Sequence, residues 1–594
     1  MSEKQIREFY DKDFLTIMRE IKKKSEVNKT FNLGKKNIIK VALLGTGSLQ
    51  YFASMLKYGL NMVDVSIEVF IGTYKGAEID IMDDDSEYYK FEPDITVIFT
   101  DYREILQFPD LYMQEEQVWK MVWEWMQKRE KLWEKVNSRC GSAIFQTNFV
   151  IPLERQLGNL EENYVWSRQS YIELLNYALK IKKKKYVTII DYNYLASAVG
   201  KRKWFDFSNY YLNKCNMSYE CLPQAVREIA LNILNYCGKY RKCIVLDLDN
   251  TLWGGVLEEV GIDGVNIFPD NPVGEAFLAF QKYLKDLKDR GIILAVCSKN
   301  DEEYAKEVFR KNDNMILKLD DISCFIANWE NKDKNIQTIS EKLNIGTDSM
   351  VFVDDNPVER NLVQVSFPEV EVVNLSEDPA DYIENIENEN YFEWLQITEE
   401  DFNRTATYIV QEEMKKAEKN SCDYMEYLNS LDMRCSADKL SEKNISRITQ
   451  LFNKTNQFNT TGFRCTEAQL LNYQNKGSYI WGFQLKDKFV NYGIVSVLLY
   501  KIEQDECIIT ALAMSCRVFK RTLEKFILNM ITEKALKEGC KKILIHYLPT
   551  ERNAMIKKIL IENDFEFDKD FFSISITDKT YFQTNIVEVN KDEY

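Results

Sequence analysis

Residues 243–253, with the sequence Cys-Ile-Val-Leu-Asp-Leu-Asp-Asn-Thr-Leu-Trp, constrain the fold of this chain more than any other stretch. The run Ile244–Leu246 is short and apolar, and polar residues follow it at once, which predicts a buried parallel strand. Asp247 and Asp249 then lie at the carboxyl end of that strand, where open α/β sheets bind their ligands. Because two carboxylates one residue apart repel each other, such a pair indicates a bound cation or a reaction that requires it.

Three later stretches bring further polar groups to the same edge of the predicted sheet. Two of them, residues 291–300 and 349–360, are predicted buried strands that end in polar side chains. The third is the segment Trp-Glu-Asn-Lys between them. Phosphoryl transfer needs an in-line nucleophile and positive charge near the phosphoryl oxygens, and these side chains meet both needs. The side chains concerned are Cys297, Ser298, Lys332, Asp354 and Asp355.

The order strand-acid, strand-Ser, Lys and strand-acid-acid resembles the four motifs of haloacid dehalogenase-type (HAD) phosphatases. The resemblance implies that Asp247 is the phosphate nucleophile and Asp249 a general acid/base. It also implies that Ser298 and Lys332 hold the phosphoryl group beside Mg²⁺. The alternative, ordinary strand-end acids that are solvated or cap helices, fits one such acid better than four motifs in register. The implied metal ligands are Asp247, Asp249, Asp354 and Asp355.

The first motif continues as Asp-Leu-Asp-Asn-Thr-Leu-Trp-Gly-Gly-Val, and with Val-Cys-Ser-Lys-Asn and Val-Asp-Asp-Asn-Pro-Val-Glu-Arg it resembles the FkbH family. Members of that family transfer a glyceryl unit from 1,3-bisphosphoglycerate to the phosphopantetheine thiol of an acyl carrier protein, with dephosphorylation, for polyketide or related biosynthesis. Asp247, Ser298 and Lys332 are too close in sequence for a large inserted cap, so we expect an open site for a bulky or protein-borne substrate. A plain Mg²⁺-dependent phosphatase, an acyltransferase for another acyl phosphate and a non-enzymatic carrier-binding scaffold remain as alternatives.

Cys297 has two interpretations. A thiolate directly before Ser298 would attack an acyl phosphate and form a thioester, and the neighbouring Lys299 and a metal would lower its pKa. Alternatively, Cys297 is a small buried hydrophobe that completes the strand, since cysteine is among the most buried residue types. The family resemblance favours the nucleophile.

At 594 residues the chain is too long for a single hydrophobic core. We expect a multidomain α/β protein that contains an SGNH-like doubly wound domain, a capless HAD Rossmann-like domain and a GNAT-like α+β domain. The acidic stretch Ser376–Asn390 suggests a linker. The expected segments are an N-terminal helical segment at 1–37, the SGNH-hydrolase-like domain at 38–237, the HAD-like domain at 238–391 and the GNAT-like domain at 392–594.

Residues 38–237 alternate predicted strands with helical patterns, which indicates a doubly wound sheet. Gly45-Thr-Gly-Ser48 follows the first strand, where an SGNH hydrolase has its serine, but the one histidine of the chain is His546. We therefore expect a structural or docking domain and no hydrolysis by a triad. The predicted strands are Ile38–Leu44, Val65–Ile71, Ile95–Thr100, Ala143–Thr147 and Val187–Asp191.

The strands, helix and strand predicted after residue 430 resemble a GNAT acyltransferase, which holds pyrophosphate on an Arg-x-x-Gly-x-Gly/Ala turn. Here the turn is Arg517-Val-Phe-Lys520-Arg521-Thr522 and both small residues are absent. These basic residues still offer charge to a phosphopantetheine or CoA phosphate, so we expect carrier docking and not acetyl-CoA turnover. The predicted elements are the strands Met433–Ser436, Tyr479–Leu485, Gly493–Tyr500, Cys507–Ser515 and Lys542–Tyr547 and the helix Leu523–Gly539.

Composition limits the partners. The net charge of −16 argues against a general nucleic-acid binder. No run of eighteen apolar residues occurs and Met-Ser-Glu-Lys-Gln is not a signal peptide, so we expect a cytoplasmic protein without membrane contact. The thirteen cysteines have no paired CxxC spacing, which indicates reduced thiols.

Overall fold

The computed structural model describes residues 3–27, 38–395, 397, 402, 428–550 and 552–589. The chain forms two compact units, Met1–Leu234 with Thr466–Asn472, and Asn235–Cys465 with Tyr473–Tyr594. The helical patterns expected between residue 392 and the strand near Met433 fall largely outside the described residues, as does part of the segment 1–37. In the part of the chain that is described, no helix is long and apolar enough to cross a membrane.

The first unit is built on a parallel sheet with strand order β2-β1-β3-β4-β5. Helices connect successive strands, so the expected doubly wound arrangement is confirmed, and all five predicted strands are present. The strands are β1 Ile39–Leu44, β2 Ile67–Ile71, β3 Ile95–Ile98, β4 Ala143–Thr147 and β5 Val187–Ile190. The helices are α1 Glu3–Tyr10, α2 Phe14–Val27, α3 Gln50–Met62, α4 Ala77–Met82, α5 Glu87–Phe91, α6 Glu115–Arg139, α7 Arg168–Lys182, α8 Tyr192–Val199, α9 Lys201–Trp204, α10 Phe207–Asn213 and α11 Leu222–Tyr236, with 3₁₀ turns η1 Tyr102–Glu104 and η2 Gly158–Asn163.

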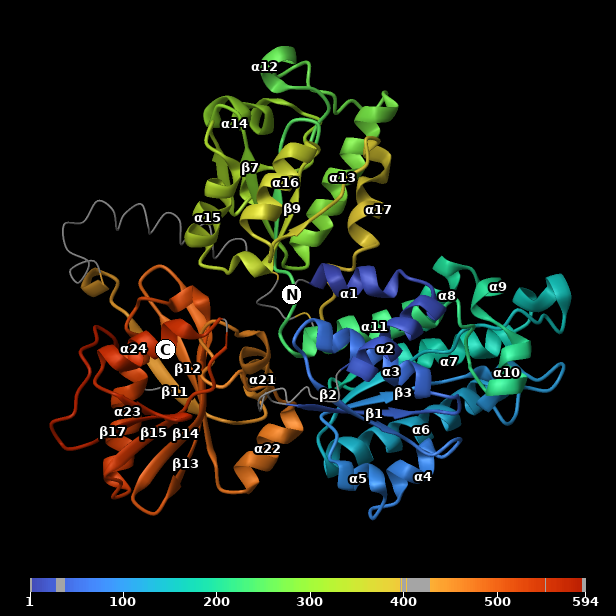
Figure 1. Ribbon diagram of the computed structural model, residues 1–594, viewed down its shortest axis with the longest axis horizontal. Helices are drawn as coiled ribbons and strands as arrows, with labels where there is room; N and C mark the ends of the chain where they lie inside the picture. The colour runs from blue at the N-terminus through green and yellow to red at the C-terminus, as the bar shows by residue number, and fades with distance from the viewer. Residues whose placement is uncertain are drawn as a thin grey trace. The chain divides into compact units, whose positions relative to one another are not determined.

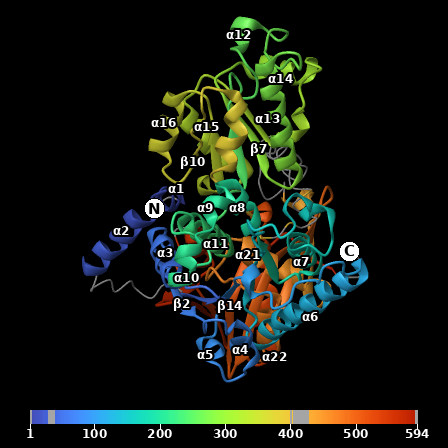
Figure 2. The same cartoon turned by 90° about the vertical axis from the view of Figure 1, so that its right-hand side faces the viewer.

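Helix α6 carries a stripe of four tryptophans, Trp119, Trp123, Trp125 and Trp133, and it packs against α7 (Figure 2). The indole of Trp133 is fully buried and donates a hydrogen bond of 3.1 Å to the Gln146 side chain. Trp119 and Trp123 lie one helical turn apart and stack with their ring centres 5.5 Å apart. The stripe is therefore core packing with a stacked pair at its edge.

The second unit contains another parallel sheet, with strand order β10-β9-β6-β7-β8. Alternate residues of the strands enter two cores, as the two-residue strand period requires. Ile244 and Leu246 lie in one core with α13, α14 and α17, whereas Val245 lies in the other with α15 and α16 (Figure 1). The strands are β6 Cys243–Leu246, β7 Ile293–Ser298, β8 Cys324–Ala327, β9 Met350–Val353 and β10 Glu371–Val372. The helices are α12 Leu257–Val260, α13 Pro272–Asp289, α14 Glu302–Lys311, α15 Lys332–Leu343, α16 Pro357–Ser366 and α17 Tyr382–Glu387, with 3₁₀ turns η3 Leu319–Asp321, η4 Thr347–Ser349 and η5 Pro379–Asp381.

The expected linker Ser376–Asn390 is wrong, because this stretch folds back onto α13 as η5 and α17. Tyr382 and Ile386, four positions apart on one helix face, are 2% and 1% exposed in the same core as Ile244. The acidic residues of the stretch lie around this apolar pair. The sequence analysis therefore missed an amphipathic helix, because acidic residues dominate the composition of this stretch.

The remainder of the second unit is a mixed sheet with strand order β16-β17-β15-β14-β13-β12-β11-β18. All five strands and the helix predicted from the sequence are present, and the sequence analysis missed the three strands nearest the carboxyl terminus. The strands are β11 Arg434–Lys439, β12 Tyr479–Lys486, β13 Asn491–Glu503, β14 Glu506–Met514, β15 Lys542–His546, β16 Glu566–Asp568, β17 Phe571–Ser575 and β18 Val587–Glu588. The helices are α21 Ile445–Lys454, α22 Glu467–Asn475, α23 Leu523–Lys537 and α24 Ala554–Glu562, with the 3₁₀ turn η6 Cys516–Val518.

Candidate active site

Two acids and a lysine meet at the carboxyl ends of the adjacent strands β6 and β9. Asp247 follows β6 and Asp354 follows β9. Lys332, the first residue of α15, places its Nζ 2.9 Å from Asp247 Oδ2 and 2.6 Å from Asp354 Oδ2. All three side chains are buried. The structure thus brings together three residues that lie far apart in sequence, at the edge where the strand pattern predicted a site.

When ionised, Asp247, Asp354 and the adjacent Asp355 carry more negative charge than the single positive charge of Lys332 can neutralise. Burial and the charge of Asp247 raise the pKa of Asp354 to about 7. Burial and Asp247 also raise the pKa of Asp355. Burial by itself would lower the pKa of Lys332, but the two carboxylates beside it hold that pKa above its ordinary value. The lysine stays cationic, and the acids would ionise fully only with further positive charge nearby.

A metal ion would supply that charge. Asp247, Asp354 and Asp355 each offer a carboxylate oxygen, and these oxygens lie within 4.8 Å of one another. The Oδ1 atom of Asp247 is buried and has no hydrogen-bond partner among the described residues. A set of carboxylate oxygens with one orphaned acceptor fits a hard divalent cation such as Mg²⁺.

Asp249, which the sequence analysis placed among the metal ligands, is not in this group of oxygens. Its Oδ1 accepts hydrogen bonds from the Trp253 indole at 2.9 Å and from the Leu257 amide at 3.1 Å. Its Oδ2 accepts one from the Asn300 side-chain amide at 3.0 Å. Burial raises the pKa of Asp249. This arrangement fits a fixed general acid better than a metal ligand.

Ser298 ends β7, the strand next to β6, and is 1% exposed. The amide of Asn300 lies 3.3 Å from its hydroxyl and so links Ser298 to Asp249. The sequence analysis did not assign a role to Asn300 or to Arg360. The Arg360 guanidinium donates to the backbone oxygens of Asp354 and Asp355 at 2.8 Å each and fixes the acidic turn. Asn300 stands two positions after Ser298, and Arg360 stands five positions after Asp355. Their positions inside the motifs were the sequence signal that could have identified them.

Comparison with known proteins identifies the family. Residues 40–235 match the model of the FkbH N-terminal domain, and residues 242–367 match that of NLI interacting factor-like phosphatases. A solved structure, the N-terminal part of the protein BF1531 from Bacteroides fragilis containing a phosphatase domain complexed with Mg, is 34% identical, with a TM-score of 0.55. The match covers 67% of this chain and all of that chain. The chain belongs to the FkbH-like family of HAD-type proteins.

No curated protein matches the sequence. Two solved acetyltransferases match smaller parts of this FkbH-like chain. The ribosomal-protein-S18-alanine N-acetyltransferase from Escherichia coli is 12% identical with a TM-score of 0.20, and covers 25% of this chain and 99% of its own. The PaiA N-acetyltransferase from Thermoplasma acidophilum, solved with coenzyme A, is 13% identical with a TM-score of 0.20, and covers 24% and 99%. At these values the GNAT-like interpretation of residues 392–594 stays a prediction.

Cys297 of the FkbH-like chain lies in the apolar core beneath α15 and is 0% exposed. Its Sγ lies 3.8 Å from the backbone oxygen of Lys332. Burial raises the pKa of the thiol far above its ordinary value. Lys299, which was expected to lower that pKa, instead places its Nζ 2.5 Å from Glu359 Oε1. This placement favours the buried-hydrophobe interpretation of Cys297 and disfavours the nucleophile.

The three basic residues proposed for phosphopantetheine or CoA have different surroundings. Arg521 is buried, 2.6 Å from Asp487 Oδ2, so its charge serves an internal ion pair. Lys520 is exposed, whereas Arg517 lines a cavity described below. Lys520 and Thr522 adopt φ angles of 64° and 61°. They stand at the two positions where the Arg-x-x-Gly-x-Gly/Ala turn of GNAT acyltransferases has small residues. The turn therefore keeps a backbone that glycine favours, with side chains that obstruct close approach.

Strands β14 and β15 pair over only part of their length, and beyond that part the backbone of Thr460 lies between them. The two strands pair only from Glu506 to Ile509, and beyond this the Thr460 amide donates to the Leu512 carbonyl at 3.0 Å. The carbonyl of Thr460 accepts from the Leu548 amide at 2.9 Å. An extended ligand cannot use these backbone groups, because Thr460 already does.

In the first unit, the Ser48 hydroxyl donates to the Gln50 side chain at 2.8 Å. Thr46 of the same loop donates to Glu104, whose pKa burial raises to about 7. No histidine stands in this unit, since His546 belongs to β15 of the other. The loop thus lacks the base that a triad hydrolase needs.

Proposed function

We propose that this chain transfers a glyceryl unit from 1,3-bisphosphoglycerate to the phosphopantetheine thiol of an acyl carrier protein and removes the phosphate, for polyketide or related biosynthesis. The observation that carries the proposal is the convergence of Asp247, Lys332 and Asp354 at the carboxyl ends of β6 and β9 in an FkbH-like chain. A HAD-type phosphatase site of this composition acts on phosphate groups, and the FkbH resemblance supplies the glyceryl substrate and the carrier.

The donor carries an acyl phosphate and a phosphate ester, and the two require different chemistry. In transfer, the carrier thiolate attacks the acyl carbon, the bond from that carbon to the phosphate oxygen breaks, and inorganic phosphate leaves. Attack by Asp247 on the acyl phosphate would instead release a free carboxylate and lose the activation. We therefore assign Asp247 to the phosphate ester that remains.

Removal of the ester phosphate uses two acids in turn. An Asp247 carboxylate oxygen bonds to phosphorus as the phosphorus–oxygen bond to the glyceryl unit breaks, and Asp249 gives its proton to the departing oxygen. Water then attacks the aspartyl phosphate and gives a proton to Asp249, which restores both side chains and releases phosphate. The raised pKa of Asp249 and its three hydrogen bonds support this role.

Ser298 and Lys332 would hold the phosphoryl oxygens during both steps. Mg²⁺ held by Asp247, Asp354 and Asp355 would screen the charge of the nucleophile from the phosphate. Because Cys297 is buried, we favour direct transfer from the acyl phosphate to the carrier thiol, without an enzyme thioester.

The other segments would serve binding. We propose that residues 38–237 form a non-hydrolytic SGNH-like docking domain, that residues 238–391 catalyse, and that residues 392–594 form a GNAT-like domain that contacts the carrier. Scattered thiols fit a cytoplasmic protein of this kind.

The test is to incubate the chain with 1,3-bisphosphoglycerate, Mg²⁺ and a carrier protein and to weigh the carrier intact. Wild type should add the mass of an unphosphorylated glyceryl unit, and Asp247→Asn should add that of a phosphoglyceryl unit. Asp313→Asn, which changes an exposed acid of the same domain, is the matched control. Phosphate release without a carrier adduct would indicate a plain phosphatase, and neither product would indicate a scaffold.

A further inference from the structure

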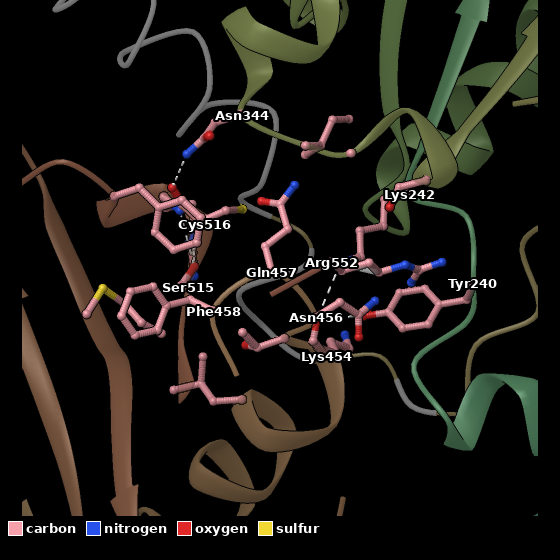
Figure 3. A pocket seen from close by; sticks show the side chains of 18 of the residues that line it. Tyr240, Lys242, Asn344, Lys454, Asn456, Gln457, Phe458, Ser515, Cys516 and Arg552 are labelled. Carbon is pink, nitrogen blue, oxygen red and sulfur yellow. Dashed lines mark hydrogen bonds between the residues drawn. The ribbon is translucent and has the colours of Figure 1, made fainter. Parts of the chain in front are cut away.

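Arg517 lines a small cavity of the second unit, in which polar side chains contact one another (Figure 3). The cavity is about 100 Å³. Asn344 donates from its side chain to the Cys516 carbonyl at 2.6 Å across it. Asp348 forms an ion pair with Arg552. These contacts are made within the protein, so they give no reason to place a ligand there.

A larger cavity of the same unit lies between α23 and the segment 578–588, which follows β17. Its volume of about 620 Å³ is that of a small-molecule site. Asn529 of α23 fixes the segment, because its amide donates to the Phe582 carbonyl at 2.7 Å and accepts from the Phe582 amide at 2.8 Å. The hydroxyls of Thr522 and Thr584 form a second link, 2.9 Å apart. The segment is therefore held on α23, and the cavity is preformed.

The cavity has an apolar lining with one unsatisfied polar group. Thr532 of α23 lines the cavity and is 2% exposed. Its hydroxyl has no hydrogen-bond partner in the described part of the chain. A buried hydroxyl without a partner costs free energy, so a ligand atom that bonds to it would stabilise the complex. The apolar lining residues are Phe526, Met530, Leu536 and Ile586.

The mouth of the cavity carries an excess of negative charge. Glu533, Asp578 and Glu588 line it and are exposed. Lys537, the one basic residue among the described residues of the lining, lies 2.5 Å from Glu533 Oε1. Asp578 and Glu588 form no ion pair with a residue that the structure describes, and Tyr581, which is 67% exposed, adds an aromatic ring to the lining. Two uncompensated carboxylates and a tyrosine ring attract a cation and repel an anion.

We propose that this cavity binds an organic cation with an apolar body. Its ammonium group faces Asp578 and Glu588, its body lies on the apolar side chains, and a neutral polar group bonds to the Thr532 hydroxyl. The cavity shares no residue with the phosphatase centre. The inference therefore stands independently of glyceryl transfer.

The experiment measures binding to the full-length chain by calorimetry at neutral pH and low ionic strength, where surface charges are least screened. Three probes of similar shape separate the contributions. Tyramine has an ammonium group and a phenol, 3-(4-hydroxyphenyl)propionate has a carboxylate in place of the ammonium, and 2-phenylethylamine lacks the hydroxyl. We expect tyramine to bind about tenfold more tightly than the propionate and about threefold more tightly than 2-phenylethylamine. No saturable binding of tyramine, or equal affinity for tyramine and the propionate, would overturn the proposal.

The charged end is tested by replacing both unpaired acids. Asp578→Asn with Glu588→Gln should weaken tyramine binding about tenfold and should not weaken binding of the propionate. Glu566→Gln with Asp568→Asn, which changes two exposed acids of β16, is the matched control and alters the net charge equally. Equal weakening of tyramine binding by the two double variants would mean that net charge alone attracts the cation, and the proposed site would be wrong.

The buried end is tested with Thr532→Val, which keeps the shape of the side chain and removes its hydroxyl. This variant should weaken tyramine binding about threefold and leave 2-phenylethylamine binding unchanged. Without a probe it should unfold at the wild-type denaturant concentration or above, because no internal hydrogen bond is lost. Unchanged tyramine affinity, or unfolding at a lower denaturant concentration, would show that the hydroxyl has another partner and would contradict its role in binding.

Discussion

The side-chain amide of Asn300 donates a hydrogen bond of 3.0 Å to the carboxylate of Asp249. The same nitrogen lies 3.3 Å from the Ser298 hydroxyl. One amide therefore orients both the proposed general acid and a proposed phosphate-binding hydroxyl. This bond also lowers the pKa of Asp249 against the larger upward effect of burial.

Removal of the ester phosphate can be assayed on 3-phosphoglycerate, the free acid of the phosphoglyceryl unit. We expect Asn300→Ala to lower kcat for this substrate about 10- to 100-fold with little change in KM, because the acid loses its orientation. Without the Asn300 bond the pKa of Asp249 rises. Asp249 must be protonated to act, so the basic limb of the pH–rate profile should move to higher pH. p-Nitrophenyl phosphate, whose leaving group needs no proton, should lose far less activity.

Asn361→Ala, at an exposed position of α16, is the matched control for Asn300→Ala. Equal losses on 3-phosphoglycerate and p-nitrophenyl phosphate would mean that Asn300 supports the fold of the site and not proton transfer.

Lys332 neutralises two buried carboxylates, and its removal should be costly. We expect Lys332→Met to lower the free energy of unfolding by about 3–5 kcal/mol, because Asp247 and Asp354 then lie buried without a cation. Adding Asp354→Asn should restore part of this loss, and denaturant unfolding would measure both. Lys334→Met, at an exposed position two residues further along α15, should leave the free energy of unfolding unchanged. If the destabilisation of the double variant equals the sum of the destabilisations of the two single variants, Lys332 and Asp354 do not belong to a shared charge network.

The acids and their strands could be predicted from the sequence because the signal is local. A short apolar run that ends in aspartate marks both a buried strand and its carboxyl end, and parallel strands bring those ends together. The structure agrees for Asp247, Ser298 and Asp354. Lys332 was placed by motif order alone, and its contact with both acids depends on α15 beginning at that residue.

The face of the sheet on which a motif side chain lies, and the partner it contacts, could not be predicted in the same way. Cys297 and Ser298 are adjacent, but the two-residue strand period directs them to opposite faces of β7. Arg521 belongs to an ion pair with Asp487, which lies 34 positions earlier in the chain, and no local pattern reveals such a partner. Strand β16 has three residues, all exposed, and β17 has five residues of which only Phe572 is buried, so neither has the apolar run that signals a buried strand.

Glu104 gives the first unit a pH dependence. Burial raises its pKa to about 7 in the folded chain, above about 4.3 in the unfolded chain. Its contribution to stability is therefore fully present below about pH 4 and is lost as the pH rises through 7, at a cost of about 3–4 kcal/mol. Glu104→Gln cannot ionise, so its melting temperature should match wild type near pH 4 and exceed it at pH 8.

Glu162→Gln, at an exposed position, is the control for Glu104→Gln and should follow the wild-type curve at every pH. If Glu104→Gln melts below wild type at pH 8, the ionised carboxylate is stabilised in the folded chain and the burial argument fails.

Cys297 decides how the acyl group reaches the carrier. Its thiol is fully buried in the core with Ile336 and Ile339, and burial raises its pKa, so the thiolate that a thioester route requires is strongly disfavoured. We expect Cys297→Ala to lower the free energy of unfolding by about 1–2 kcal/mol and to leave the rate of glyceryl loading within about threefold of wild type. Cys243→Ala removes an equally buried thiol at the far end of the neighbouring strand and is the matched control for packing. Loading that is lost in Cys297→Ala but kept in Cys243→Ala, together with a glyceryl adduct on the Cys297 peptide, would restore the thioester route. It would also require the core beneath α15 to open during the reaction, since the acyl phosphate has no other access to that sulfur.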